Sequence, residues 1–263
     1  MRNSFCALAC WDWSAWRLYI LMAGAIVMRD IRKNPSYFLA LIERNQSEIK
    51  LFHDWIMNGE VATERICHIK RTIYQHKRNI WYAKYSLGEQ VFNLLDSYEE
   101  MTNDFLENFV PEWYEDGLLL LSLGILLNSD FKLFEALAVK VQEDGKNDWL
   151  YNYLINSRIS NVEYKNCKIL WPSIYLPLRK IVEESQNKPA DMCKYLSKTW
   201  YKSHKDSPWY NTHLREKDDK FDYDKSTYRG YWSFESGAVA KLLGFDDLAL
   251  KDTHYYPYDL VHW

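Results

Sequence analysis

From residue 34 onward, apolar residues recur every three or four positions, and this spacing limits what the chain can fold into. A period near 3.6 places apolar side chains on one face of an α-helix, whereas a half-buried strand needs strict alternation. No stretch of alternating β-branched residues competes with the helical pattern. We therefore predict an all-α protein, a multi-helix bundle with an N-terminal and a C-terminal helical domain.

Proline, glycine and capping residues divide this pattern into helices. Asn34-Pro35 has the form of an N-cap followed by proline at the first helical position, and Asn58-Gly59 ends the first helix. The run EWYEDGLLLLSLGILL is apolar on most sides, so we expect a buried helix, and it is too short to span a bilayer. The predicted helices cover residues 34–58, 61–86, 89–109, 112–127, 130–145, 147–158, 172–186, 190–203 and 230–243.

The length of 263 residues allows one large domain or two small ones, and an apolar content of 48% is enough for a real core. We predict an N-terminal helical domain over residues 28–150 and a C-terminal one over 151–263. The two are expected to meet near residues 145 to 165.

The first 27 residues resemble a secretory signal only superficially. Asp12 and Arg17 interrupt the segment, and the eleven apolar residues from Leu18 to Met28 are fewer than the roughly 20 that a membrane helix needs. Met28 opens MRDIRKNPSYF, which looks like an ordinary protein start. We interpret residues 1–27 as a non-native or over-called extension, with a signal or membrane anchor as the alternative.

Net charge and cysteine usage narrow the function classes. The formal net charge of −3 excludes a strongly basic nucleic-acid binder, because such binding needs clustered Lys and Arg to displace counterions. No pair of cysteines has C-x-x-C spacing, so neither a disulfide framework nor a structural zinc site is indicated, and a reducing cytoplasm is expected. The cysteines are Cys6, Cys10, Cys67, Cys167 and Cys193.

Charge is strongly segregated between two neighbouring predicted helices. Residues 63–84 are basic, with Glu64 the single acid, whereas residues 89–116 contain nine acids and no Lys or Arg. Asp96, Glu100 and Glu107 follow helical steps away from the apolar set, so they line one face. The candidate partner-binding residues are Asp96, Glu99, Glu100, Asp104, Glu107, Glu112, Glu115 and Asp116.

Two interpretations of this acidic stripe stay open. The two helices could be neighbours whose opposite charges partly offset each other, which contributes little stability per exposed pair. Alternatively, the carboxylates could face a basic partner and speed the encounter by electrostatic steering. A nuclease is an obvious partner of this kind, because its cleft must attract phosphates.

The stretch DDKFD is the strongest candidate for a metal site. Asp218, Asp219 and Asp222 have the spacing that holds magnesium in all-α isoprenoid enzymes. However, lysines dilute the segment, it lacks an apolar helical stripe, and no second acidic motif completes a site. We expect a solvated loop, and we predict no metal and no cofactor, since phosphate-binding and dinucleotide motifs are absent too.

The sequence gives little support for nucleophilic or acid–base catalysis. Ser233 and Ser236 are not in a G-x-S-x-G elbow, and the histidines include no H-E-x-x-H; His254 and His262 lack ligand spacing. Glu235 is the most interesting acid, because apolar neighbours predict that it is half buried. We expect a structural carboxylate bound by a tyrosine hydroxyl or Arg229, with a general acid as the alternative. No catalytic residue is predicted.

The C-terminal stretch YRGYWSFESGAVAKLLGFDD, followed by LKD and YYPYDL, resembles the signature of the PoNi-type immunity proteins. The segment MRDIRKNPSYFLALIERNQSEI is similar to the helical domain that precedes this signature in the family. The resemblance covers most of residues 28–262. The signature residues are Tyr228, Gly230, Tyr231, Trp232, Glu235, Gly237, Pro257, Tyr258 and Asp259.

The resemblance implies a non-enzymatic, cytoplasmic immunity protein with two helical domains. Its partner would be a DNase toxin of the PoNe type, delivered between bacteria by secretion systems such as type VI, with no direct contact to nucleic acid or membrane. Combined with the charge pattern, this predicts that the acidic helix face docks against the basic cleft of the toxin. The alternatives are a metal-dependent all-α enzyme using DDKFD and a generic helical scaffold.

Overall fold

The computed structural model describes residues 27–108, 113–143, 147–216 and 220–263. Within these ranges it contains helices and no strand; a single isolated bridge joins Asp148 to Lys168. The all-α prediction is confirmed. The proposed N-terminal extension lies outside the described residues except for Val27, and the domain division at residues 150 and 151 stays a prediction.

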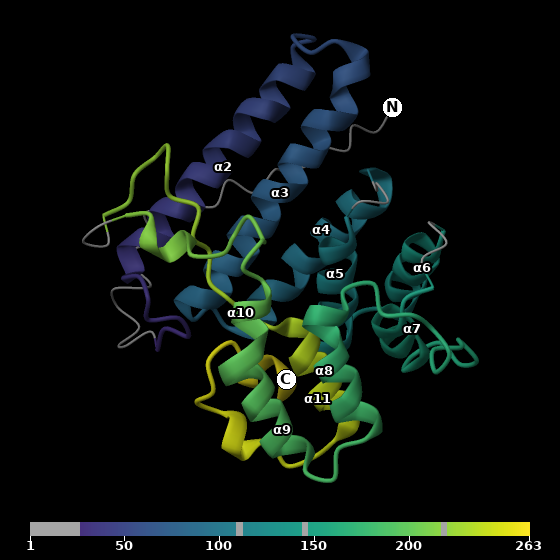
Figure 1. Cartoon of the computed structure of the whole chain (residues 1–263). Helices are drawn as coiled ribbons and strands as arrows, with labels where there is room; N and C mark the ends of the chain where they lie inside the picture. Colours follow the sequence, from purple (N-terminus) through teal and green to yellow (C-terminus); the bar gives the residue numbers. More distant parts are fainter. Residues whose placement is uncertain (1–26, 109–112, 144–146, 217–219) are drawn as a thin grey trace.

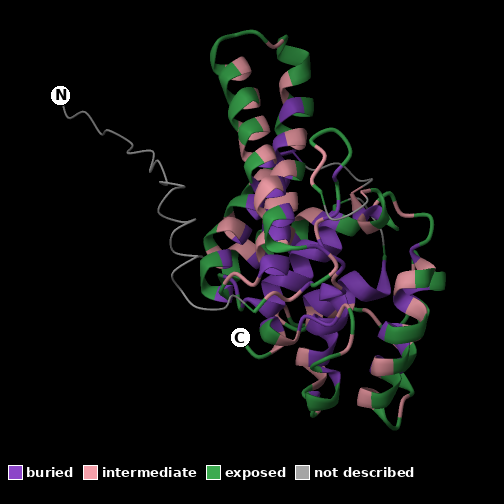
Figure 2. Ribbon diagram, turned by 90° about the vertical axis from the view of Figure 1, so that its left-hand side faces the viewer, coloured by how far each residue is buried: buried purple, intermediate pink, exposed green. Residues whose placement is uncertain are grey.

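A long helical hairpin opens the fold. It pairs α2 (Pro35–Met57) with α3 (Thr63–Leu87), and it projects from the rest of the molecule in Figures 1 and 2. The side chain of Asn34 accepts a hydrogen bond from the backbone N–H of Tyr37, as the N-cap prediction requires. Gly88 ends α3 with a φ of 103°, a conformation that glycine adopts without a steric penalty.

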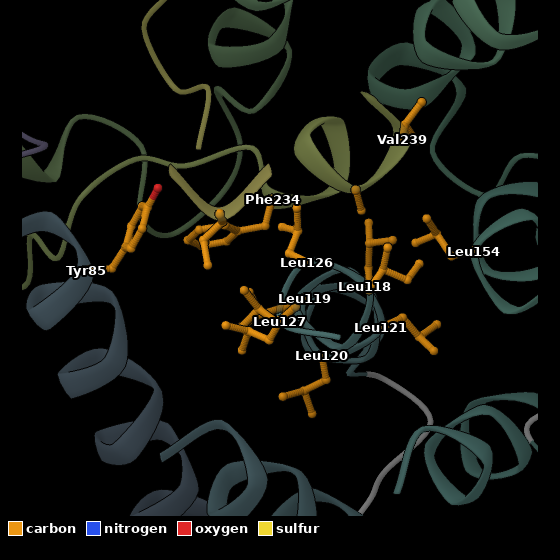
Figure 3. Close-up of a cluster of buried hydrophobic side chains, with 14 of the residues drawn as sticks. Tyr85, Leu118, Leu119, Leu120, Leu121, Leu126, Leu127, Leu154, Phe234 and Val239 are labelled. Atoms are coloured by element: carbon orange, nitrogen blue, oxygen red, sulfur yellow. The ribbon is translucent and has the colours of Figure 1, made fainter. Parts of the chain in front are cut away.

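The middle of the chain wraps around one buried helix. A 3₁₀ turn (Val91–Leu94) leads into α4 (Leu95–Asn108), which is followed by α5 (Tyr114–Leu126), α6 (Phe131–Gln142) and α7 (Trp149–Asn156). Every residue of α5 except Glu115 is buried. Figure 3 shows the leucines of α5 pointing outward in all directions, toward Tyr85 of α3, Leu154 of α7 and Phe234. This confirms that the helix predicted at 112–127 is central to the core.

The C-terminal helices cover the other side of α5. They are α8 (Pro172–Glu183), α9 (Lys188–Tyr195), a π-helical turn (Leu196–Trp200), α10 (Tyr201–Ser203), α11 (Phe234–Leu243) and α12 (Tyr258–Val261), with 3₁₀ turns at Thr212–Leu214 and Leu248–Leu250. The predicted start of the helix at residue 230 is wrong by four residues. Gly230 has a φ of 106°, and the N–H of Ser233 donates to the carbonyl of Tyr255, so the chain becomes helical only at Phe234.

Residues 29–33 tie the N-terminal end of the chain to its C-terminal part. The Nε of Arg29 lies 2.6 Å from a carboxylate oxygen of Asp259, and the Nζ of Lys33 lies 3.4 Å from Glu216 in a pair whose side chains are almost fully buried. Both pairs join residues about two hundred positions apart in the sequence. None of the helices in the described ranges is long and apolar enough to cross a membrane.

Candidate functional site

The acidic face lies on α4, where the spacing predicted it. Asp96, Glu100 and Glu107 are exposed, while Glu99 and Asp104 are partly buried beside them. Their positions follow the helical steps that keep them on the side of α4 away from its buried residues. Glu112 lies outside the described residues.

Lysines of α3 neutralise part of this face. The Nζ of Lys77 lies 2.7 Å from Glu100 and 2.6 Å from Asp104, and the Nζ of Lys70 lies 3.6 Å from Glu107. Although burial opposes the charged form of Lys77, hydrogen bonds to the two carboxylates raise its pKa. The offsetting of charge between neighbouring helices is therefore real.

The two acids at the start of α4 lack such partners. Neither Asp96 nor Glu99 forms an ion pair with any residue that the structure describes. Asp96 also lies in the first turn of the helix, where the backbone dipole favours a negative charge. The carboxylates of α4 that have no ion-pair partner among the described residues therefore lie toward its N-terminal end.

Asp116 and Glu115 belong to a different place, the first turn of α5. Asp116 is buried and accepts hydrogen bonds from the Nη1 of Arg78 at 2.5 Å and from the hydroxyl of Tyr74 at 3.0 Å. Burial disfavours the cation of Arg78, but the charge of Asp116 more than compensates and raises the pKa of Arg78. These contacts join α5 to α3, so Asp116 does not contribute its carboxylate to the α4 face.

A cavity of about 60 Å³ lies between the N-terminal and C-terminal parts of the chain. Its wall is built from α3, α5, α8, the π-helical turn and residues 229–235, which are the heart of the sequence signature. Many of the residues in this wall are ionisable. These include Arg78, Tyr82, Glu115, Asp116, His204, Arg229 and Glu235.

Glu235 is buried at this cavity, and one of its carboxylate oxygens accepts two hydrogen bonds. Its Oε1 accepts hydrogen bonds from the indole N–H of Trp200 at 2.6 Å and from the hydroxyl of Ser233 at 2.7 Å. These partners replace the tyrosine hydroxyl or Arg229 expected from the sequence. Burial raises the pKa of Glu235 and lowers that of the neighbouring His204, so both groups are biased toward their neutral forms.

Comparisons with known proteins identify the fold and the family. Models of the PoNe immunity protein (PoNi) N-terminal and C-terminal regions match residues 29–139 and 146–260. The chain belongs to the PoNi family. Among solved structures, that of protein PA2201 from Pseudomonas aeruginosa is similar, with 18% sequence identity, a TM-score of 0.67 and 95% of each chain covered. At this identity the likeness shows the fold alone, and no curated protein matches the chain.

Membership settles the broad function. PoNi proteins are non-enzymatic immunity proteins that bind and neutralise cognate PoNe toxins. The family resemblance noted in the sequence is thus confirmed.

The PoNi signature holds the C-terminal part together around two close backbone approaches. Tyr228 donates a hydrogen bond from its hydroxyl to Asp30, which connects the signature to the start of the fold. Gly230 packs so tightly against Ser86 that a Cβ would overlap its hydroxyl oxygen, and a Cβ on Gly237 would lie 2.5 Å from Pro257. The glycines therefore permit contacts that any larger residue would prevent.

The remaining signature residues of this PoNi protein pack around these contacts. Tyr231 lies against Tyr228 with ring centroids 4.7 Å apart, and Trp232 donates its indole N–H to the hydroxyl of Ser86. Tyr258 stacks on His262 at 4.1 Å, and Asp259 is the partner of Arg29 described above. YYPYDL thus fastens the C-terminus.

The DDKFD stretch offers no described metal site. Asp218 and Asp219 lie outside the described residues, and Asp222 accepts hydrogen bonds from the backbone N–H groups of Asp224 and Lys225 within its own turn. The side chain of Lys225 lies 3.3 Å from the same carboxylate. No group of three potential metal ligands occurs in the part of the chain that the structure describes, His254 and His262 included.

Proposed function

We propose that this PoNi protein blocks its toxin by placing the acidic face of α4 against the DNA-binding cleft of a DNase. The observation that carries the proposal is the pair of unneutralised carboxylates, Asp96 and Glu99, at the end of a helix with no basic residue. A DNase cleft must carry Lys and Arg to hold phosphates, so it would be complementary to this face. We also propose that the encounter takes place in the cytoplasm, where a DNase toxin injected by a type VI secretion system finds its target.

The ion pairs to α3 do not remove the other carboxylates from such a contact. The side chains of Glu100 and Glu107 keep 62% and 65% of their exposure although each lies near a lysine. An exposed pair contributes only about 0–1 kcal/mol, so a basic partner can share or displace the lysine at little cost. Lys77 and Lys70 would then fix the positions of the carboxylates before the toxin arrives.

The affinity of the complex should depend strongly on salt. If opposite charges across the interface drive binding, raising sodium chloride from about 50 mM to about 500 mM weakens the complex at least tenfold, chiefly by slowing association. The measurement is surface plasmon resonance of the purified pair at several salt concentrations. An affinity that is constant over this range would contradict an electrostatic contact.

A further inference from the structure

Two guanidinium groups line the cavity between the two parts of the chain, and most of their N–H groups donate to none of the described residues. Arg78 donates to Asp116 from its Nη1, and Arg229 donates to the amide oxygen of Asn79 from its Nη1 at 2.6 Å. These are their hydrogen bonds to the described residues, whereas each guanidinium has five N–H donors. The Nε of Arg78 is buried and has no hydrogen-bond partner among the described residues.

Arg229 is the more anomalous of the two. Its guanidinium lies 4.5 Å from the ring centre of Tyr82, and no carboxylate of the described residues is within ion-pair distance. Burial and the adjacent charge of Arg78 lower the pKa of Arg229 to about 10, despite the opposite effects of Asp116 and Glu115. A partly buried cation beside a second cation is costly unless an anion offsets the charge.

The acids of the cavity offset this cation only in part: the charges of Asp116 and Glu115 favour the cation of Arg229, but neither carboxylate is within ion-pair distance of it. The carboxylate of Asp116 is already occupied by Arg78 and Tyr74. Glu115 keeps contact with solvent, and burial raises its pKa, as it does for Glu235. The hydroxyl of Tyr82 has a pKa raised by burial to about 12, so it stays neutral and can donate a further hydrogen bond.

We propose that this cavity binds a small oxoanion, such as a phosphate or carboxylate group, between the guanidinium groups of Arg78 and Arg229. Its volume of about 60 Å³ has room for about four to six water-sized groups, which suits the five non-hydrogen atoms of phosphate. A guanidinium group binds two oxygens of a planar carboxylate or a tetrahedral phosphate through two parallel hydrogen bonds. Because Arg78 comes from α3 and Arg229 from the signature, the anion would link the two parts of the chain. The proposal goes beyond toxin binding and does not rest on it.

Inorganic phosphate is the probe. Thermal unfolding and isothermal calorimetry of the full chain in a zwitterionic buffer, at constant ionic strength adjusted with sodium chloride, should show binding and a rise in Tm of about 3 °C or more at saturation. Arg229→Met should abolish the heat and the shift, and it should melt no lower than the parent without phosphate because it removes a partly buried cation that is only partly compensated. Arg215→Met is the matched control, since Arg215 is exposed and bonded to Thr227; it should respond like the parent.

Absence of heat and of a Tm shift in the parent at about 10 mM phosphate, or an equal response in Arg229→Met, would overturn the proposal. If Arg229→Met does not fold, Arg78→Lys replaces it, because lysine retains the charge beside Asp116 but not the fork; at least tenfold weaker phosphate binding is expected, and unchanged binding refutes the site. Toxin affinity at saturating phosphate distinguishes the source of the anion. Competition indicates a carboxylate of the toxin, and an unchanged Kd indicates a free ion.

Discussion

Replacing Asp116 with alanine should lower the free energy of unfolding by about 3 kcal/mol or more. The substitution leaves the charge of Arg78 without its carboxylate in a largely buried position, and it removes the acceptor of the Tyr74 hydroxyl. Breaking one side of a buried pair is costly because the remaining group keeps its desolvation penalty. Urea unfolding followed by tryptophan fluorescence measures the change.

Two matched variants identify the cause. Glu107→Ala removes an exposed carboxylate of a loose pair with Lys70 and should cost no more than about 1 kcal/mol. The double variant Arg78→Met with Asp116→Leu removes both charges, so it should recover most of the loss seen in Asp116→Ala. If Asp116→Ala and the parent unfold at the same urea concentration, the buried pair does not stabilise the packing of α5 against the hairpin.

Reversing three charges of the α4 face should weaken toxin binding by about 100-fold or more. Asp96→Lys, Glu100→Lys and Glu107→Lys together replace attraction to a basic cleft by repulsion, and they should also make the remaining affinity less sensitive to salt. Calorimetry with the purified toxin gives the affinity, and co-expression with the toxin in bacteria reports protection.

The control must change net charge equally without touching α4. Glu60→Lys, Glu135→Lys and Glu184→Lys reverse three exposed carboxylates elsewhere, so both triple variants move the formal net charge from −3 to +3 because each reversal adds two. The control should bind nearly as well as the parent at physiological salt. Equal weakening in both variants would mean that overall charge, and not the α4 face, governs the encounter. Full protection by the α4 variant would refute the proposed contact.

Local patterns in the sequence predicted most of the helices. The cap at Asn34 and the continuous apolar run in α5 depend on a few neighbouring residues, and the structure contains them where expected. The start of α11 was misplaced because the aromatic residues 231 and 232 continue the helical spacing. A helix is prevented there by the positive φ of Gly230 and by the backbone hydrogen bond from Ser233 to Tyr255, which lies 22 residues further along the chain and outside any local pattern.

The two candidate sites also differ in whether local spacing or tertiary packing determines them. The α4 face follows from the spacing of Asp96, Glu100 and Glu107 along one helix, so sequence alone could place it. The cavity could not be foreseen, because Arg78 and Arg229 meet from positions about 150 residues apart in the chain. Nor could the partners of Glu235 be predicted. Trp200 is 35 residues away in the chain, and only the packing of the π-helical turn brings it to Glu235.

Zero-length carbodiimide coupling of the immunity protein to its toxin, read by mass spectrometry, shows whether the toxin sits on the acidic face of α4. The reagent joins a carboxylate to a lysine only where the two are in contact. A toxin that sits on the acidic face should yield couplings from Asp96, Glu99 and Glu100 to its own lysines, while the exposed carboxylates of Glu60 and Glu135 stay uncoupled. Couplings confined to carboxylates outside α4 would show that the toxin binds elsewhere.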